Sequence, residues 1–268
     1  MAKLGTAVPL SIAEKRDSRS LEPASRDLLK RFSGLQPHND GALDAWRHTG
    51  TWHRRVAILL CTRDGAPFLP QQLGSFKDQT HGNWELFVSD DGSQDRSLQI
   101  VRKFARELNS GQQVSVRRGP RRGATANFLS LAIDQKIDAD FFAYSDQDDI
   151  WDEDKLERAL AWLDTIPDHL PALYCSRTRV VDENGAPLGQ SPRFMLRPTF
   201  RNALVQNIGG GNTMVFNRAA RDLLARAGNL NVVAHDWWTY ILVSGAGGYV
   251  HYDPNPTLDY RQHHHNLV

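Results

Sequence analysis

The sequence predicts an α/β fold in which helices flank a central, mostly parallel sheet, and two observations predict it. From Arg55 onward, short apolar runs alternate with amphipathic helical stretches, which is typical of parallel strands joined by crossover helices. Three of the apolar runs end in polar clusters, and open sheets of this kind bind ligands at the carboxyl ends of their strands. The chain has 268 residues, of which 40% are hydrophobic and 24% are charged, enough for one large domain.

The expected elements follow one another along the chain. Apolar runs predict buried strands at residues 56–61, 84–89, 114–116 and 140–144. Helical periodicity predicts helices at residues 67–79, 97–108, 124–135 and 155–163. In the second of these helices, Leu98, Val101 and Leu108 belong to one apolar face. The second half continues with a strand at 172–181, a hairpin turn at 182–185, and helices at 218–227 and 237–243.

Residues 1–52 differ from the rest, because they show little periodicity and are rich in Ser, Pro, Asp and Arg. We expect an N-terminal extension there, partly helical or disordered, followed by one folded domain over residues 53–268. A short helix is expected at 25–32, where Leu28, Leu29 and Phe32 lie beside basic residues. Such a face suits an anionic membrane surface, although packing on the chain's own domain is the more common explanation.

The composition excludes several classes of function. The net charge is +1, which gives no electrostatic reason to expect nucleic acid as a partner. No window approaches the ~18–20 apolar residues of a membrane-spanning helix, and the N-terminus lacks the apolar core of a secretory signal. Cys61 and Cys175 lie in strand-like apolar runs, where a thiol behaves as a small buried hydrophobe. We therefore expect a cytoplasmic protein, either free or peripheral on the inner face of the cytoplasmic membrane.

The run SDQDDIW at residues 145–151 places three carboxylates within four residues. Asp146, Asp148 and Asp149 would repel one another unless a cation or hydrogen-bond donors neutralise them. Oxygen-rich ligand sets select Mg²⁺ or Mn²⁺, which commonly bridge one or two carboxylates to substrate phosphates. The alternative is that these carboxylates and Asp152 face the positive end of the helix that follows. The residues alone leave both interpretations open.

The other two polar clusters are TRDG at residues 62–65 and DDGS at residues 90–93. The second follows a strand and precedes a helix, where a carboxylate can accept hydrogen bonds from a ribose or a nucleobase imide. Its alternative is a turn followed by a helix N-cap, which Asp and Ser both favour. Considered alone, the turn is the better interpretation.

These clusters occur in a fixed order that resembles the family 2 inverting glycosyltransferases, most closely their bacterial rhamnosyltransferase-like members. The resemblance covers the chain from about Arg55 to its end. It rests on these runs: VAILLCTRDG at 56–65, QLGS at 72–75, QT at 79–80, WEL at 84–86, SDDGSQD at 89–95, GPRRGATANF at 119–128, SDQDDIW at 145–151, GNT at 211–213, HDWW at 235–238, and YRQH at 260–263 with Asn266.

The resemblance implies a GT-A-type fold with a central, mostly parallel sheet, and a glycosyltransferase catalytic domain over residues 53–268. In such an enzyme Thr62 and Asp91 help hold the nucleotide base, while Asp146 contacts the ribose or the surroundings of the metal. Asp148 coordinates the Mg²⁺ or Mn²⁺ that bridges the diphosphate, and His263 approaches the metal or the phosphates. The remaining donor-binding residues implied are Arg63, Asp64, Gln147, Gly211 and Asn212.

The resemblance further implies an inverting transfer in which Asp236 is the general base on the acceptor hydroxyl, as such chemistry requires. The expected donor is dTDP-rhamnose or a UDP-hexose. The expected acceptor is a glycan or a lipid-linked glycan, in surface glycan or polysaccharide biosynthesis.

Purely structural roles remain as alternatives for several of these residues. Asp236 suits an N-cap of a helix beginning at Trp237, and the glycines at 209–211 suit a plain tight turn. Residues 263–265, three histidines, suit an exposed tail. A zinc site made of His235 and these histidines is a weaker alternative, because the spacing repeats no standard ligand pattern.

The sequence also departs from the family pattern. Arg63 and Asp64 stand where relatives have an aromatic residue and an asparagine, so a guanidinium plane would replace an aromatic ring beside the base. Ala126 stands where a basic residue is common, which leaves Arg121 or Arg122 to supply phosphate-binding charge from that loop.

Three other classes of protein fit the sequence less well. A dinucleotide-dependent oxidoreductase is weak, because no G-x-G-x-x-G turn follows the first strand. A sugar nucleotidyltransferase would need a phosphate loop rich in glycine and arginine at 62–67, and the sequence there is not one. A non-catalytic module that binds nucleotide sugars is the best alternative outside enzymes.

Overall fold

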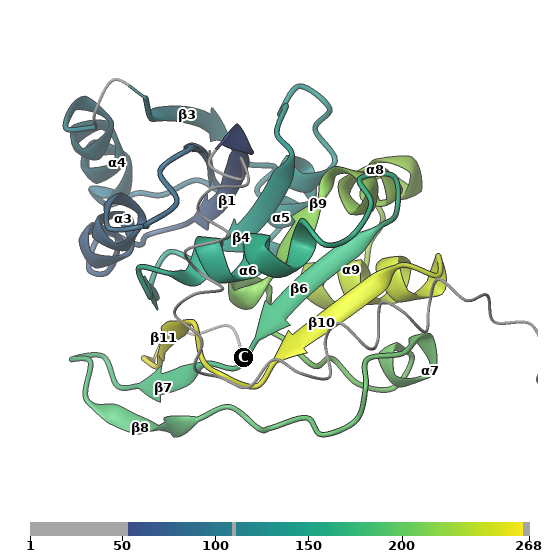
Figure 1. Ribbon diagram of the computed structural model, residues 1–268. Helices are drawn as coiled ribbons and strands as arrows, with labels where there is room; N and C mark the ends of the chain where they lie inside the picture. The colour runs from purple at the N-terminus through teal and green to yellow at the C-terminus, as the bar shows by residue number, and fades with distance from the viewer. Residues whose placement is uncertain (1–52, 109–110, 265–268) are drawn as a thin grey trace, which may run out of the picture. The chain divides into compact units, whose positions relative to one another are not determined.

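The computed structural model describes residues 53–108 and 111–264 (Figure 1). The helix expected at 25–32 and the whole extension at 1–52 lie outside the described residues, as does His265. Within the described part of the chain, no helix is long and apolar enough to cross a membrane.

A seven-stranded sheet forms the centre of the domain, in the order β10-β6-β9-β4-β1-β2-β3. Each neighbouring pair is parallel except the two that involve β9, which runs antiparallel to both β4 and β6. The strands are β1 (Val56–Thr62), β2 (Trp84–Asp90), β3 (Gln113–Arg118), β4 (Phe141–Ser145), β6 (Ala172–Ser176), β9 (Val215–Asn217) and β10 (Tyr249–Asp253). The expected mostly parallel sheet is confirmed.

Helices cover both faces of this sheet (Figure 1). One face carries α3 (Leu69–Lys77), α4 (Ser97–Arg106) and α6 (Lys155–Leu163). The other carries α5 (Ala124–Ala132), α8 (Arg218–Ala227) and α9 (His235–Gly245). Successive side chains of a strand point to opposite faces, so Ile58 and Leu60 enter the first apolar layer while Leu59 enters the second. Because both faces of β1 are covered, its sequence is one continuous apolar run.

A second, four-stranded sheet lies beside the first, in the order β5-β11-β7-β8. Its strands are β5 (Ile150–Trp151), β7 (Arg179–Val181), β8 (Pro187–Gln190) and β11 (Leu258–Arg261). The single strand expected at 172–181 is therefore wrong, because β6 and β7 belong to different sheets. Polar residues separate the two strands. Among them, the Arg177 guanidinium donates two hydrogen bonds to the Ser191 carbonyl.

The boundaries of the other expected elements hold to within a few residues. The helices α3, α4 and α5 end two or three residues early, α6 and α8 have the expected bounds, and α9 extends two residues further at each end. The hairpin turn at 182–185 is confirmed, since Asp182 N–H donates to the Ala186 carbonyl at 2.9 Å and Gly185 has a φ of 88°. Two short helices, α7 (Phe200–Ala203) and η2 (Gly211–Thr213), were not expected.

Asn217 joins three segments at the end of β9. Its Oδ1 accepts hydrogen bonds from the N–H groups of Ala220 and Ala172, both at 3.0 Å, and its Nδ2 donates to the Leu170 carbonyl at 2.7 Å. We expect Asn217→Ala to lower the free energy of unfolding by about 3 kcal/mol, because it removes the cap of α8 and leaves buried groups without partners. Urea unfolding measures the loss.

The matched control is Thr199→Ala, which removes the N-cap of α7 at an exposed position. Its loss should be about 0.5–1 kcal/mol, since water replaces the lost partner. Equal losses in the two variants would contradict the role given to Asn217.

Candidate functional site

The segment 146–149, which follows β4, connects the parts of the site. Its second residue, Gln147, closes on the end of β1, where its Oε1 accepts hydrogen bonds from Thr62 Oγ1 at 2.7 Å and Arg63 N at 2.9 Å. Its Nε2 donates back to the Arg63 carbonyl at 3.1 Å. A Cβ at Gly65 would lie 2.2 Å from Gln147 Oε1, so only glycine leaves room for this contact. Three predicted donor-binding residues are thus brought together.

The next residue, Asp148, contacts a histidine from the far end of the domain. Asp148 Oδ2 lies 2.9 Å from His263 Nε2, and their side chains are only 16% and 6% exposed. The His263 ring stacks on Phe68 with the ring centres 4.5 Å apart. Arg261 donates from Nε to the Asp148 carbonyl at 3.0 Å, which fixes the backbone at this point. The two residues predicted as metal ligands therefore lie side by side.

The fourth residue, Asp149, is fully buried and leads to the far side of the site. Its Oδ2 accepts a hydrogen bond from Asn212 Nδ2 at 2.6 Å. Gly211, the residue before Asn212, donates its N–H to Asp236 Oδ2 at 3.0 Å. Two consecutive residues of η2 therefore hold Asp149 of the acidic segment and Asp236, the predicted base.

Asp236 lies in the first turn of α9, and its carboxylate is held by three donors. Asn207 Nδ2 and Gly211 N donate to Oδ2, both at 3.0 Å, while Trp237 N donates to Oδ1 at 2.7 Å. The N-cap alternative is wrong, because α9 begins at His235 and its N-cap is Ala234. A Cβ at Gly211 would lie 2.4 Å from His235 Nε2, so this glycine is needed for close packing against α9.

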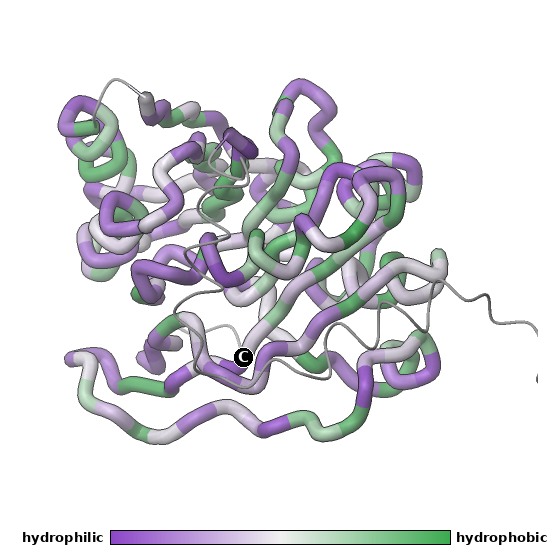
Figure 2. Tube along the Cα trace, in the orientation of Figure 1, coloured by the Kyte–Doolittle hydropathy of each residue, from purple (hydrophilic) through white to green (hydrophobic). Residues whose placement is uncertain are grey.

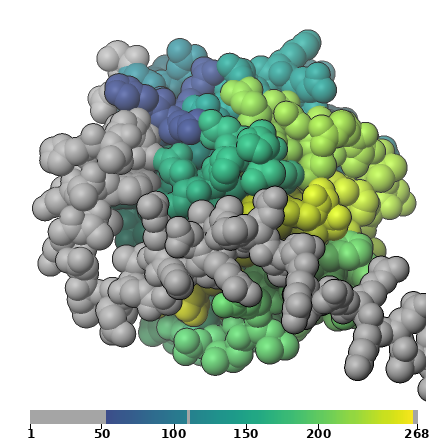
Figure 3. Space-filling model, turned by 45° about the vertical axis from the view of Figure 1, so that its right-hand side comes forward, coloured from purple at the N-terminus to yellow at the C-terminus, as the bar shows by residue number. Residues whose placement is uncertain are grey.

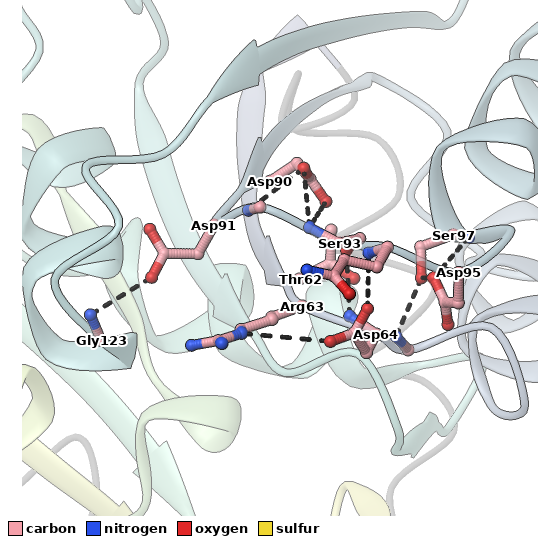
Figure 4. Close-up of polar contacts among 12 residues, drawn as sticks. Thr62, Arg63, Asp64, Asp90, Asp91, Ser93, Asp95, Ser97 and Gly123 are labelled. Atoms are coloured by element: carbon pink, nitrogen blue, oxygen red, sulfur yellow. Dashed lines mark hydrogen bonds and ion pairs between the residues drawn. The ribbon is translucent and has the colours of Figure 1, made fainter.

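The ends of β1 and β2 form a network of side-chain to backbone hydrogen bonds (Figure 4). Asp91 accepts from Arg121 N at 2.5 Å and from Gly123 N at 3.2 Å, which ties it to the loop before α5. Asp64, with a φ of 51°, accepts from Gln94 N at 2.7 Å.

The DDGS run forms the turn that was its alternative, because Asp90 accepts hydrogen bonds from Gly92 N and Ser93 N. The run does not supply the helix cap, since the N-cap of α4 is Arg96. The carboxylates of Asp64 and Asp91 thus both stabilise the loops around them by accepting backbone hydrogen bonds.

Negative charge is concentrated around Asp146. No hydrogen bond or ion pair to its carboxylate is found within the described residues. Desolvation raises the pKa of the Asp146 carboxyl well above its usual range, and the charges of Asp149, Asp148 and Asp236 raise it further. Burial also raises the pKa of Asp149 to about 7, with the Asp148 charge next in effect.

The structure corrects two alternatives. Asp148 and Asp149 do not face the positive end of α6, because β5 separates them from that helix and its N-cap is Asp154. The zinc site is not formed by the described histidines, since His235 stacks on Phe128 while His263 stacks on Phe68. Across residues 53–108 and 111–264, no three His, Cys, Asp or Glu side chains are grouped to hold a metal by themselves.

Sequence reasoning missed two residues that hold the site together. Lys155 is fully buried and donates from Nζ to the Asn212 carbonyl at 2.9 Å, with the Trp151 ring 4.5 Å away. A signal was present, because Lys155 shares the helix stripe of Ala159 and Leu163. Arg261, 2% exposed, gave no signal beyond its place in the YRQH run.

A family model described as glycosyl transferase family 2 matches residues 57–224. The chain belongs to glycosyl transferase family 2. The dTDP-rhamnosyl transferase RfbG of Shigella flexneri is 28% identical over 222 residues, which are 78% of this chain and 73% of that protein. The putative teichuronic acid biosynthesis glycosyltransferase TuaG of Bacillus subtilis is 23% identical over 177 residues, which are 62% of this chain and 64% of that protein.

Solved glycosyltransferases have the same fold as this family 2 chain. S. aureus TarS 1-349 in complex with UDP-GlcNAc matches with a TM-score of 0.59 and 17% identity, over 79% of this chain and 60% of that one. The mannosyltransferase PcManGT from Pyrobaculum calidifontis, in complex with GDP-Man and Mn²⁺, matches with a TM-score of 0.57 and 20% identity, over 82% of this chain and 64% of that one. The chain spans less than two thirds of the length of either structure. The expected GT-A fold is confirmed.

His235 makes the stability of this glycosyltransferase depend on pH. Burial against Phe128 and Tyr144 lowers the pKa of His235 to about 4 from 6.5, although the Asp236 charge acts in the opposite direction. Between these values the unfolded chain holds the proton and the folded chain does not. The free energy of unfolding should therefore fall as the pH falls through this window, by at most about 3 kcal/mol for this group.

We expect His235→Phe to remove this loss, which urea unfolding at several pH values measures. The control is His169→Phe, at an exposed position where both states are hydrated. The same dependence on pH in wild type and His235→Phe would contradict the assignment.

Proposed function

We propose that this glycosyltransferase transfers a sugar with inversion from a nucleoside-diphosphate donor to a hydroxyl of a glycan or lipid-linked glycan acceptor. One observation carries the proposal: Gly211 and Asn212, consecutive in the chain, hydrogen-bond to Asp236 and to the acidic segment respectively. A diphosphate bound at the acidic segment and an acceptor beside Asp236 would share one site, as an in-line displacement requires.

The nucleoside belongs at the ends of β1 and β2. Thr62, Arg63 and Gln147 are joined there by hydrogen bonds, and Asp91 lies at the end of the neighbouring strand. The exposed Arg63 guanidinium offers a plane for stacking on a base. The first proposed donor substrate is dTDP-rhamnose, and the name of the RfbG relative supports it. The second is a UDP-hexose, which the UDP-GlcNAc complex of TarS supports.

The ligands present fit a Mg²⁺ or Mn²⁺ ion that is completed by substrate. Asp148 and His263 offer one carboxylate and one imidazole in contact. The Asp146 carboxylate precedes them in the same acidic segment and adds to the negative charge there. Such ions commonly take one or two protein ligands, with water and phosphate oxygens in the other positions. When bound, the cation neutralises the charge that develops on the departing diphosphate. The Mn²⁺ in the PcManGT complex supports this cofactor.

Asp236 is the proposed base. As the acceptor oxygen attacks the anomeric carbon, its proton moves to the Asp236 carboxylate while the bond to the diphosphate oxygen breaks. Asn207 Nδ2 and Gly211 N both donate hydrogen bonds to Asp236 Oδ2, so they orient the carboxylate before the acceptor substrate binds.

The metal assignment is tested by calorimetric titration with UDP and dTDP. We expect Asp148→Ala to weaken binding of the preferred nucleotide by at least about tenfold in Mg²⁺ or Mn²⁺, and EDTA to weaken wild-type binding similarly. Asp78→Ala, at the exposed C-cap of α3, is the control and should bind as wild type. Tight binding by Asp148→Ala in EDTA would refute the assignment.

The base assignment is tested by turnover. Asp236→Asn should lower the rate of transfer from the preferred nucleotide sugar by about 10²–10⁴-fold, the usual contribution of a general base. Donor affinity should not change, because Asp236 lies on the acceptor side. Asp78→Asn is the control.

Two results would contradict this role. Unchanged turnover would favour a non-catalytic module that binds nucleotide sugars. Equal loss of donor binding would assign Asp236 to the structure of the site.

A further inference from the structure

A surface with both apolar and basic side chains runs from the end of β8 through α7. Its large apolar side chains reach water to an unusual extent: Met195 is 77% exposed, Leu196 83%, Phe200 43%, Leu204 56% and Val205 77%. We call it the 193–205 surface. Figure 2 shows hydrophobic and hydrophilic residues interspersed along this part of the trace, and Figure 3 shows residues of this region, in green, on the lower surface. An exposed apolar cluster of this kind marks an interaction site.

The charge of this surface is entirely positive. Arg193, Arg197 and Arg201 are exposed between the apolar side chains. The sequence contains no Asp or Glu between Glu183 and Asp222, although the whole chain is nearly neutral, with a net charge of +1. Positive charge beside exposed apolar side chains is complementary to a bilayer that contains anionic lipids, because the arginines bind phosphates while the apolar groups enter the interface.

The 193–205 surface is held rigidly on the domain. Trp237 Nε1 donates to the Ala203 carbonyl at 2.6 Å, and Thr199 N donates to Tyr240 Oη at 3.1 Å. One edge of the Phe200 ring packs against Gly245, where an added Cβ would lie 3.0 Å away. These contacts attach α7, and with it the C-terminal part of the 193–205 surface, to α9.

The surface adjoins the proposed base. Val205 is two residues from Asn207, a separation of at most about 7 Å along the backbone. Asn207 Nδ2 in turn donates to Asp236 Oδ2. A bilayer that contacts Val205 would therefore lie close to the position where an acceptor meets Asp236.

We propose that the 193–205 surface docks this glycosyltransferase on a bilayer containing anionic lipids. Docking presents Asp236 to an acceptor carried by a lipid in that bilayer, a part of the inference that rests on the proposed function. It places membrane contact in the folded domain, apart from the N-terminal extension.

Vesicle sedimentation of the full chain tests the docking without requiring turnover. Wild type should bind vesicles of phosphatidylcholine with phosphatidylglycerol, bind phosphatidylcholine alone more weakly, and lose binding as salt is raised. Replacing all three arginines by glutamine should weaken binding to anionic vesicles about a hundredfold. Met195→Glu together with Leu196→Glu should weaken it at least about tenfold.

The matched control is Val116→Glu, which places the same charge at a 42% exposed valine on β3, the opposite edge strand of the main sheet. It should bind vesicles as wild type. Calorimetry with the preferred nucleotide should give the same affinity for all these variants, so a failure of donor binding is separable from a failure of docking. For an acceptor held in vesicles, the Met195 and Leu196 variant should lower kcat/KM while donor affinity stays unchanged.

Three results would overturn the proposal. Variants of the 193–205 surface that bind anionic vesicles as wild type would move any membrane contact elsewhere, including to the N-terminal extension. Equal binding to neutral and anionic vesicles would remove the role of the arginines. A dimer in light scattering that Leu196→Glu dissociates would assign the surface to a second copy of the chain.

Discussion

The site depends on how the buried Asp149 carboxylate is satisfied. A carboxylate removed from water must find hydrogen-bond donors or cations, because leaving it without partners is costly. Asn212 supplies one donor, and Lys155 holds the Asn212 backbone carbonyl from the other side. This pairing fixes η2, and η2 carries the N–H that orients Asp236. The placement of Asp236 relative to the acidic segment thus follows from a requirement of the core.

Arg261 has a similar role for the C-terminal part of the domain. Its guanidinium donates to the Asp148 and Glu183 carbonyls and to the Gln71 side chain, at 3.0, 2.6 and 2.5 Å. It thereby joins β11, the β7–β8 turn and α3 around the acidic segment. The planar fork of arginine suits this task, because it presents several donors in fixed directions. His263 reaches Asp148 because the residue two positions earlier is anchored in this way.

The sequence predicted the first four strands, most helices and the polar clusters that follow three of those strands, because these depend on local apolar periodicity and on which residues follow a strand. It did not predict that one apolar stretch divides between two sheets, since the partners of β6 and of β7 lie in parts of the chain that are distant in sequence. It also did not show that the carboxylates of Asp64 and Asp91 bind backbone N–H groups of their own loops. Such contacts are set by tertiary structure, and a turn-forming aspartate has the same sequence signature as a ligand-binding one.

The reversed direction of β9 has a consequence for how such sites are recognised. In a parallel sheet, the loops that gather at one edge all come after their strands, as those following β1, β2 and β4 do here. Because β9 runs the other way between β4 and β6, its beginning reaches that same edge, and the residues that precede it lie beside the acidic segment. A glycine and an amide ahead of a short strand, rather than behind one, are therefore a signature to seek when a parallel sheet contains a single inverted strand.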